Sequence, residues 1–140
     1  FVLCRTSNPG AADVQDLELA SGEPLYERVA SLADLWNAND NVGLVVGATS
    51  PDELEAIREQ VPDLPFLVPG VGAQGGDAEA AATHALADGA GLVNSSRGII
   101  FAGEDAASGR RTESRDAGDE FADAAGQAAK RLKRRLNQYR

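Results

Sequence analysis

Residues 42–53 read Val-Gly-Leu-Val-Val-Gly-Ala-Thr-Ser-Pro-Asp-Glu. The first seven form an uninterrupted apolar run, which is typical of a strand buried on both faces of a parallel sheet. The hydroxyl residues and the proline that follow predict a helix start, because Ser and Thr cap helices and proline is tolerated in the first turn. The stretch therefore predicts a strand followed at once by a helix, which is the repeating unit of parallel α/β folds.

The same order of strand, loop and helix occurs four times along the chain. Further strands are predicted at residues 1–5, 66–68 and 91–94. Helices are predicted at residues 11–20, 24–36, 51–61, 77–88 and 117–138, and a polar surface loop is predicted at residues 103–118. Four such units form either a small open sheet or half of an eight-unit barrel. We take residues 1–140 as a single structural unit.

Composition and charge argue against several classes of function, among them nucleic-acid binding and membrane association. With 140 residues, 43% hydrophobic and 25% charged, the chain is one soluble globular unit. The net charge of −9 argues against partners such as nucleic acid or an anionic membrane surface. No apolar run approaches the roughly 20 residues of a membrane span, and no signal peptide is visible. We therefore expect a cytoplasmic protein that binds neither membrane nor nucleic acid.

Several conspicuous residues have ordinary structural interpretations. Cys4 is predicted to be a small buried apolar residue, His84 a surface or boundary residue, and Trp36 a member of the apolar face of its helix. One cysteine and one histidine exclude an intrachain disulfide and a Cys-rich or His-rich metal site. The six bases within residues 130–140 are interpreted as a solvated helix end that complements the helix dipole.

The polar and glycine-rich segments all follow predicted strands. They comprise Thr6-Ser7-Asn8-Pro9-Gly10 and residues 47–49, 69–76 and 95–98. In parallel α/β folds, ligands bind at the carboxyl ends of the strands, where these loops would gather. The sequence therefore predicts a binding site at this edge, although the first segment is also a common turn and cap sequence.

The residues of two of these loops indicate that the site binds an anion. Residues 69–76 hold four glycines and Gln74, and their backbone amides can point at a ligand. Arg97, after the next strand, can grip a phosphate with its planar guanidinium. The alternatives are an ordinary tight turn for the glycine-rich loop and a surface carboxylate partner for Arg97. Together, the two loops predict one phosphate site.

These motifs, in this order and at this spacing, resemble the C-terminal half of the orotidine 5'-phosphate decarboxylase family, type 2 branch. The segments are Thr6-Ser7-Asn8-Pro9, residues 46–49, residues 69–76 and Asn94-Ser95-Ser96-Arg97-Gly98-Ile99, and the resemblance covers about residues 1–102. It implies a (β/α)8 TIM barrel of which this chain supplies strands 5 to 8. It also implies a homodimer that converts orotidine 5'-phosphate to UMP and carbon dioxide without cofactor or metal.

The resemblance also implies roles for individual residues. Ser7 would hydrogen-bond the pyrimidine, and Pro69 would line the pocket for the ring. Gln74 would bridge the pyrimidine edge and the phosphate. Arg97 would bind the phosphate, helped by backbone amides around Ser96 and Gly98.

The sequence departs from the family in one respect. The family's catalytic Asp-x-Lys-x-x-Asp array is absent, and the only lysines are Lys130 and Lys133. No catalytic residue is therefore expected in this chain. Because it also lacks methionine and opens in an apolar run, we expect it to be the C-terminal part of a longer protein. The alternatives are a non-enzymatic half-barrel that binds a nucleotide or sugar phosphate and, less favoured, another phosphate-binding barrel enzyme.

Overall fold

A computed structural model describes residues 1–71, 76–86, 91–103 and 116–139. Its sheet has four parallel strands, as predicted, and their order is β1-β2-β3-β4. The strands are β1 (Val2–Arg5), β2 (Leu44–Val46), β3 (Phe66–Val68) and β4 (Gly91–Val93). Because all four run in one direction, the loops that follow them emerge at the same edge of the sheet.

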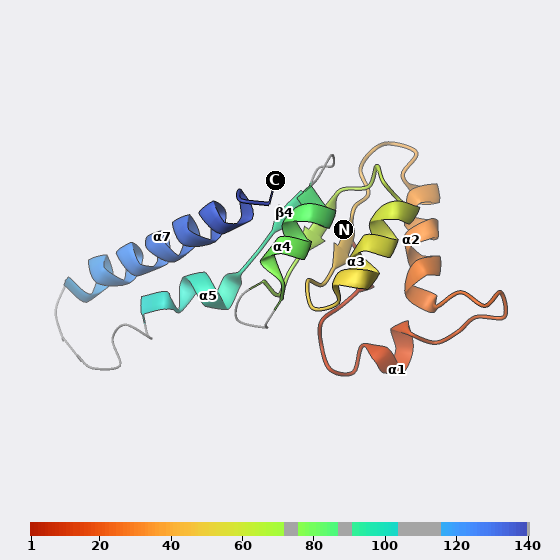
Figure 1. Ribbon diagram of the computed structural model, residues 1–140, viewed down its shortest axis with the longest axis horizontal. Helices are drawn as coiled ribbons and strands as arrows, with labels where there is room; N and C mark the ends of the chain where they lie inside the picture. Colours follow the sequence, from red (N-terminus) through yellow and green to blue (C-terminus); the bar gives the residue numbers. More distant parts are fainter. Residues whose placement is uncertain (72–75, 87–90, 104–115, 140) are drawn as a thin grey trace.

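The helices connect consecutive strands and extend beyond the last one (Figure 1). α2, α3 and α4 lie beside the sheet, whereas α5 and α7 lie against each other past β4. Their bounds are α1 (Ala12–Gln15), α2 (Leu25–Trp36), α3 (Pro51–Gln60), α4 (Ala78–Ala80), the π-helix η1 (Ala81–Leu86), α5 (Ser96–Ile100) and α7 (Asp116–Leu136).

The core lies between one face of the sheet and the helices. Leu44, Val46, Phe66 and Val68 are fully buried and belong to one cluster with apolar residues of α2, α3, α4 and η1. The alternate strand residues point to the opposite face, as the pleat requires. Figure 1 shows α2, α3 and α4 beside the strands.

The opposite face of the sheet carries one apolar row. Leu3, Val45, Leu67 and Leu92 are neighbours in register across all four strands. The outer two are 66% and 60% exposed, and the inner two are half-buried. The prediction that residues 42–48 are buried on both faces is therefore correct only for the helix-covered face.

Three local predictions are wrong: the length of the first helix, the burial of Trp36, and the loop predicted at residues 95–98. The helix predicted at residues 11–20 ends at Gln15, because residues 17–25 fold back as a small antiparallel turn, with a bridge between Glu18 and Pro24. In that turn Leu25 N donates to Leu17 O at 2.9 Å and Gly22 adopts a φ of +88°. Trp36 is 57% exposed: it is the last residue of α2, whose buried residues are Ala30 and Ala33.

Other elements follow the sequence more closely. Cys4 is buried and His84 is half-buried, as predicted. Asp77 caps α4 by accepting a hydrogen bond from Glu79 N at 2.8 Å. Residues 96–98, predicted as a loop, lie in the short helix α5. Most of the polar segment 103–118 lies outside the described residues.

Candidate functional site

Backbone hydrogen bonds join neighbouring strands just beyond their carboxyl ends. Gly47 N donates to Arg5 O at 2.8 Å, Ala48 N to Pro69 O at 3.1 Å, and Asn94 N to Val68 O at 3.1 Å. These bonds continue the parallel ladder past the assigned strands and fix where each loop leaves the sheet. The loops predicted to bind a ligand therefore start from one rigid edge.

A small open cleft of about 90 Å³ lies at this edge. It is lined by residues that follow two adjacent strands: Pro69, Gly70, Val71, Asn94, Ser95, Ser96 and Arg97. Sites for whole drug-sized ligands usually have several times this volume, so this cleft has room for one small group of a ligand. The sequence predicts a phosphate at this place, which is a group of that size.

The base of the glycine-rich loop is tightly closed. Gly76 N donates to Gly70 O at 3.1 Å, and a Cβ at position 76 would approach Gly70 O to 2.6 Å. Gly70 has a φ of +94°, a conformation that favours glycine. Glycine is therefore required at position 76 by the close approach of the backbone and at position 70 by the positive φ. Gln74 lies outside the described residues.

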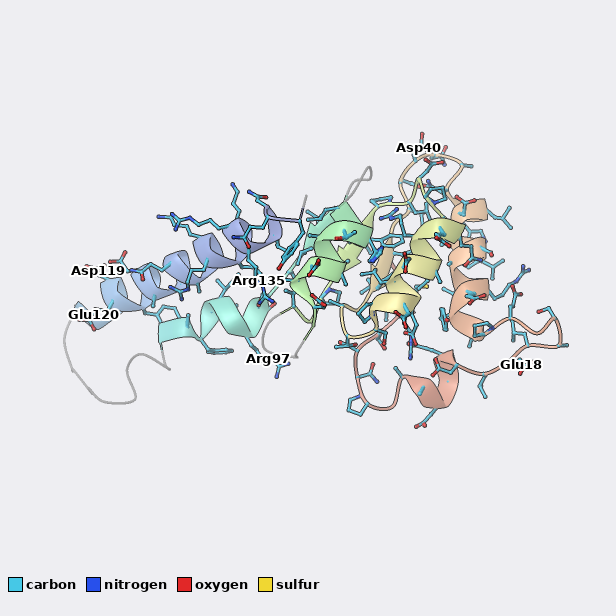
Figure 2. All side chains as sticks on the ribbon, in the orientation of Figure 1. Glu18, Asp40, Arg97, Asp119, Glu120 and Arg135 are labelled. Atoms are coloured by element: carbon cyan, nitrogen blue, oxygen red, sulfur yellow. The ribbon has the colours of Figure 1, made fainter. Side chains whose placement is uncertain are left out.

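Arg97 is the cation of the cleft. Its side chain is exposed at the strand-end edge of the molecule, below the junction of β4 and α5 (Figure 2). Among the described residues, Arg97 has no carboxylate partner. The alternative that a surface carboxylate neutralises Arg97 therefore finds no support in the described part of the chain.

The polar groups beside Arg97 are partly engaged with one another. Asn94 Nδ2 donates to Ser96 Oγ at 3.2 Å. A Cβ at Gly98 would approach Ser95 Oγ to 2.8 Å, so a side chain there would require the Ser95 hydroxyl to move. Gly98 follows Arg97 in α5 but does not line the cleft.

Ser7 lies elsewhere on the same edge. It follows β1, which β2 and β3 separate from β4, and it does not line the cleft. Its backbone is close to β2, because a Cβ at Gly47 would approach both Ser7 N and Ser7 Cβ to 3.1 Å. The structure thus brings Pro69, Ser96 and Arg97 together at the cleft, whereas Ser7 follows β1, at the opposite side of the sheet from β4.

Sequence reasoning missed a buried cation beside Ser7. Arg5 is 9% exposed and forms ion pairs with Glu53 and Asp16, at 2.5 Å and 3.2 Å. The hydrogen bond with Glu53 raises the pKa of Arg5, which keeps the guanidinium charged. Its sequence signal was a charged residue that ends an apolar strand next to a polar loop.

Two further features bear on the site. No group of three or more His, Cys, Asp or Glu side chains within the described ranges is arranged to hold a metal ion. In that same part of the chain, no helix has both the length and the apolar character that crossing a bilayer requires.

Known proteins match this chain along its whole length. It is 77% identical over 140 residues to the orotidine 5'-phosphate decarboxylase of Haloarcula marismortui, of which it covers 49%, and 49% identical over 144 residues to that of Bordetella pertussis, of which it covers 48%. The chain thus spans about half the length of the curated relatives that it matches.

Solved structures give the same result. The orotidine 5'-phosphate decarboxylase of Leishmania donovani superimposes with a TM-score of 0.68 at 37% identity, with 97% of this chain and 47% of that chain covered. The putative enzyme of Toxoplasma gondii gives a TM-score of 0.67 at 28% identity, with 99% and 50% covered. The prediction that the four-stranded sheet is about half of such a TIM barrel is confirmed.

The model of one protein family covers residues 1–112 of the chain. Together with the identity to curated relatives, this match confirms the resemblance carried by the four loops. The chain belongs to the orotidine 5'-phosphate decarboxylase / HUMPS family.

Proposed function

We propose that this chain is the pyrimidine- and phosphate-binding half of an orotidine 5'-phosphate decarboxylase, which converts orotidine 5'-phosphate to UMP and carbon dioxide. The observation that carries the proposal is the cleft between two adjacent strand ends, where Arg97 is exposed without a carboxylate partner among the described residues. It sits in a chain 77% identical to a decarboxylase of that name. A phosphate would give the Arg97 guanidinium a doubly hydrogen-bonded partner.

The proposed roles follow the order of the loops. Arg97 binds the phosphate, with backbone amides near Ser96 and Gly98 as further donors. Pro69 borders the pocket of the pyrimidine ring, and Ser7 hydrogen-bonds the pyrimidine. Gln74, in the glycine-rich loop, is proposed to bridge the base and the phosphate.

The chemical step needs a cation and a proton donor beside the reacting carbon, and neither arginine near a strand end is proposed to supply them, because Arg5 is engaged by Glu53 and Asp16 and Arg97 is proposed to bind the phosphate. Loss of carbon dioxide leaves an electron pair at C6 of the pyrimidine, which requires a nearby cation and a proton donor. The only lysines, Lys130 and Lys133, lie in the terminal helix α7. We therefore propose that a Lys/Asp array from the other half of the barrel performs catalysis, within a homodimer and without cofactor or metal.

A chimera tests this function. This chain replaces the matched half of the Haloarcula marismortui relative, and loss of orotidine 5'-phosphate absorbance is followed. We expect turnover by the chimera and none by the 140-residue chain alone. A chimera that binds UMP without turnover would instead favour a non-enzymatic phosphate-binding half-barrel. Failure to bind UMP would reject both functions.

A further inference from the structure

The end of β1 departs from a regular strand. Leu3 pairs with Val45 and Arg5 with Val46, so the register shifts by one residue between them. In a regular strand, neighbouring residues point to opposite faces, yet Cys4 and Arg5 are both buried. An irregularity of this kind redirects a side chain, and such irregularities are frequent beside functional sites.

The shift places both residues among the helices. Cys4 Sγ donates to Tyr26 O of α2 at 3.2 Å. Arg5 Nε and Nη2 donate to the two carboxylate oxygens of Glu53 in α3, at 2.5 Å and 3.1 Å. A guanidinium held by two parallel hydrogen bonds has a fixed orientation. Arg5 therefore serves as a rigid support beneath the loop that follows it.

Gln15 connects this support to the loop. Its Oε1 accepts a hydrogen bond from Arg5 Nη1 at 3.3 Å and another from Thr6 N at 2.9 Å. Its Nε2 donates to Thr6 Oγ1 at 3.0 Å. The Gln15 amide thus binds both the backbone and the side chain of the residue that precedes Ser7.

The loop continues the same chain of contacts. Thr6 Oγ1 donates to Asn8 Oδ1 at 2.5 Å, which links the two residues on either side of Ser7. On the other side, the Ser7 backbone passes so close to Gly47 that a Cβ there would lie 3.1 Å from Ser7 N. Ser7 is therefore confined between Gly47 and a loop anchored by Gln15.

From these contacts we propose that Gln15, oriented by the Arg5–Glu53 ion pair, is a positioning residue that sets Ser7 for recognition of the pyrimidine base. The inference rests on the proposed function and adds a residue outside the cleft. The cleft lies at the ends of β3 and β4, and β2 separates it from β1, so loss of Gln15 should weaken recognition of the base and leave phosphate binding intact.

The test compares two ligands in the chimera described above. UMP carries the base and the phosphate, whereas ribose 5-phosphate carries the phosphate without the base. For Gln15→Ala we expect the Kd of UMP to rise about tenfold, the effect of one good hydrogen bond, with the Kd of ribose 5-phosphate unchanged. Gln15→Glu keeps the acceptor for Thr6 N and loses the donor to Thr6 Oγ1, so its Kd for UMP should be intermediate.

Gln60→Ala is the matched control. Gln60 Nε2 donates to Glu27 O and Ser31 Oγ, at 3.1 Å and 2.6 Å, and thereby joins α3 to α2 away from the loop. Gln60→Ala removes an amide similar to that of Gln15, and it should leave the affinities for UMP and ribose 5-phosphate unchanged. If Gln15 had only a structural role, Gln15→Ala would weaken the binding of both UMP and ribose 5-phosphate, or of neither. Either result would overturn the inference.

The outcomes separate the inference from the function on which it rests. If the unmodified chimera binds UMP no more tightly than ribose 5-phosphate, the proposed function fails and the inference fails with it. If the chimera prefers UMP and Gln15→Ala retains the full preference, the function stands and only the inference is rejected. If the chimera prefers UMP and Gln15→Ala selectively loses that preference, both the proposed function and the inference are supported.

Discussion

Arg5 and Arg97 both lie near the carboxyl end of an outer strand, but their surroundings differ. Arg5 is 9% exposed and has two carboxylate partners, Glu53 and Asp16. Arg97 is exposed and has no such partner among the described residues. Because the Arg5 guanidinium is already engaged, Arg97 is the arginine of this pair that remains available to an anionic ligand.

Replacement of Arg97 should therefore affect binding rather than folding. For Arg97→Ala in the chimera, we expect the Kd of UMP to rise about tenfold or more, since a charge-assisted hydrogen bond contributes roughly 1.5–3 kcal/mol. The melting temperature should not change, because the side chain is exposed. Titration calorimetry and a thermal melt measure the two effects.

Arg28→Ala is the control for Arg97, because Arg28 is an exposed arginine of α2. It should leave the Kd of UMP unchanged. Arg97→Lys keeps the charge without the planar fork and should bind UMP with intermediate affinity. An unaltered Kd in Arg97→Ala would remove this residue from the site.

Cys4 should be chemically inert in the folded protein. Burial raises the pKa of its thiol to about 12, despite the opposing effect of the nearby Arg5 charge. Thiolate is the reactive species, so iodoacetamide at pH 8 should label Cys4 slowly in the native protein and rapidly in urea. Equal rates in both conditions would contradict the buried position.

The same pKa shift links stability to pH. The folded state binds the Cys4 proton more tightly than the unfolded state, whose thiol has a pKa near 9.0. The stabilisation is therefore complete below about pH 9 and declines as pH rises toward the folded pKa of about 12. Cys4→Ala should reduce this decline in the free energy of unfolding, measured by urea titration between those pH values.

At the scale of secondary-structure elements, Arg58 joins α3 to its neighbours. Its guanidinium lies 3.6 Å from the centre of the Phe66 ring in β3. It also donates to backbone carbonyls of Leu64 at 2.9 Å and of His84, in η1, at 2.8 Å. One side chain thus satisfies carbonyl groups around the end of α3 and within η1.

Loss of this side chain should destabilise the fold. For Arg58→Met we expect the free energy of unfolding to fall by about 3 kcal/mol, because partly buried carbonyls lose their donors and the ring loses its cation. Urea unfolding of the chimera measures the change, with Arg28→Met as the matched control. A loss no larger than that of the control would show that Arg58 does not join these elements.

These elements also show how far the sequence predicts local structure. The buried runs around Leu44 and Phe66 were predictable because their apolar patterns are local. The register shift in β1 was not, because it depends on the pairing of Arg5 with Glu53, 48 residues away. The early end of α1 depends on a turn closed between Leu17 and Leu25, which helical periodicity does not reveal.

At the scale of the whole molecule, the sequence predicted the parallel sheet and the edge that carries the loops. Pro69, Ser96 and Arg97 converge as expected, because parallel strands bring their carboxyl ends together. The position of Ser7 relative to the cleft could not be predicted from the sequence, because it depends on the order of the strands in the sheet. The roles of these residues in ligand binding remain predictions.

The exposed face of the sheet leads to a prediction about the isolated chain. The row formed by Leu3, Val45, Leu67 and Leu92 crosses the whole sheet, and its outer members are 66% and 60% exposed. β1 and β4 are also edge strands, whose free backbone groups can pair with another chain. The other half of a barrel would cover this row and both edges, as the relatives' double length allows.

We therefore expect the 140-residue chain to self-associate in sedimentation experiments, to bind a hydrophobic dye, and to lack decarboxylase activity. Refolding it together with a fragment carrying the other four strands should remove dye binding and produce turnover. Leu92→Lys should reduce self-association, because it charges the exposed row. Leu35→Lys should not, because Leu35 is 72% exposed on α2, away from that face. A lone chain that sediments as a dye-free monomer would contradict the half-barrel interpretation of this face, and turnover by that chain would contradict the assignment of catalysis to the other half.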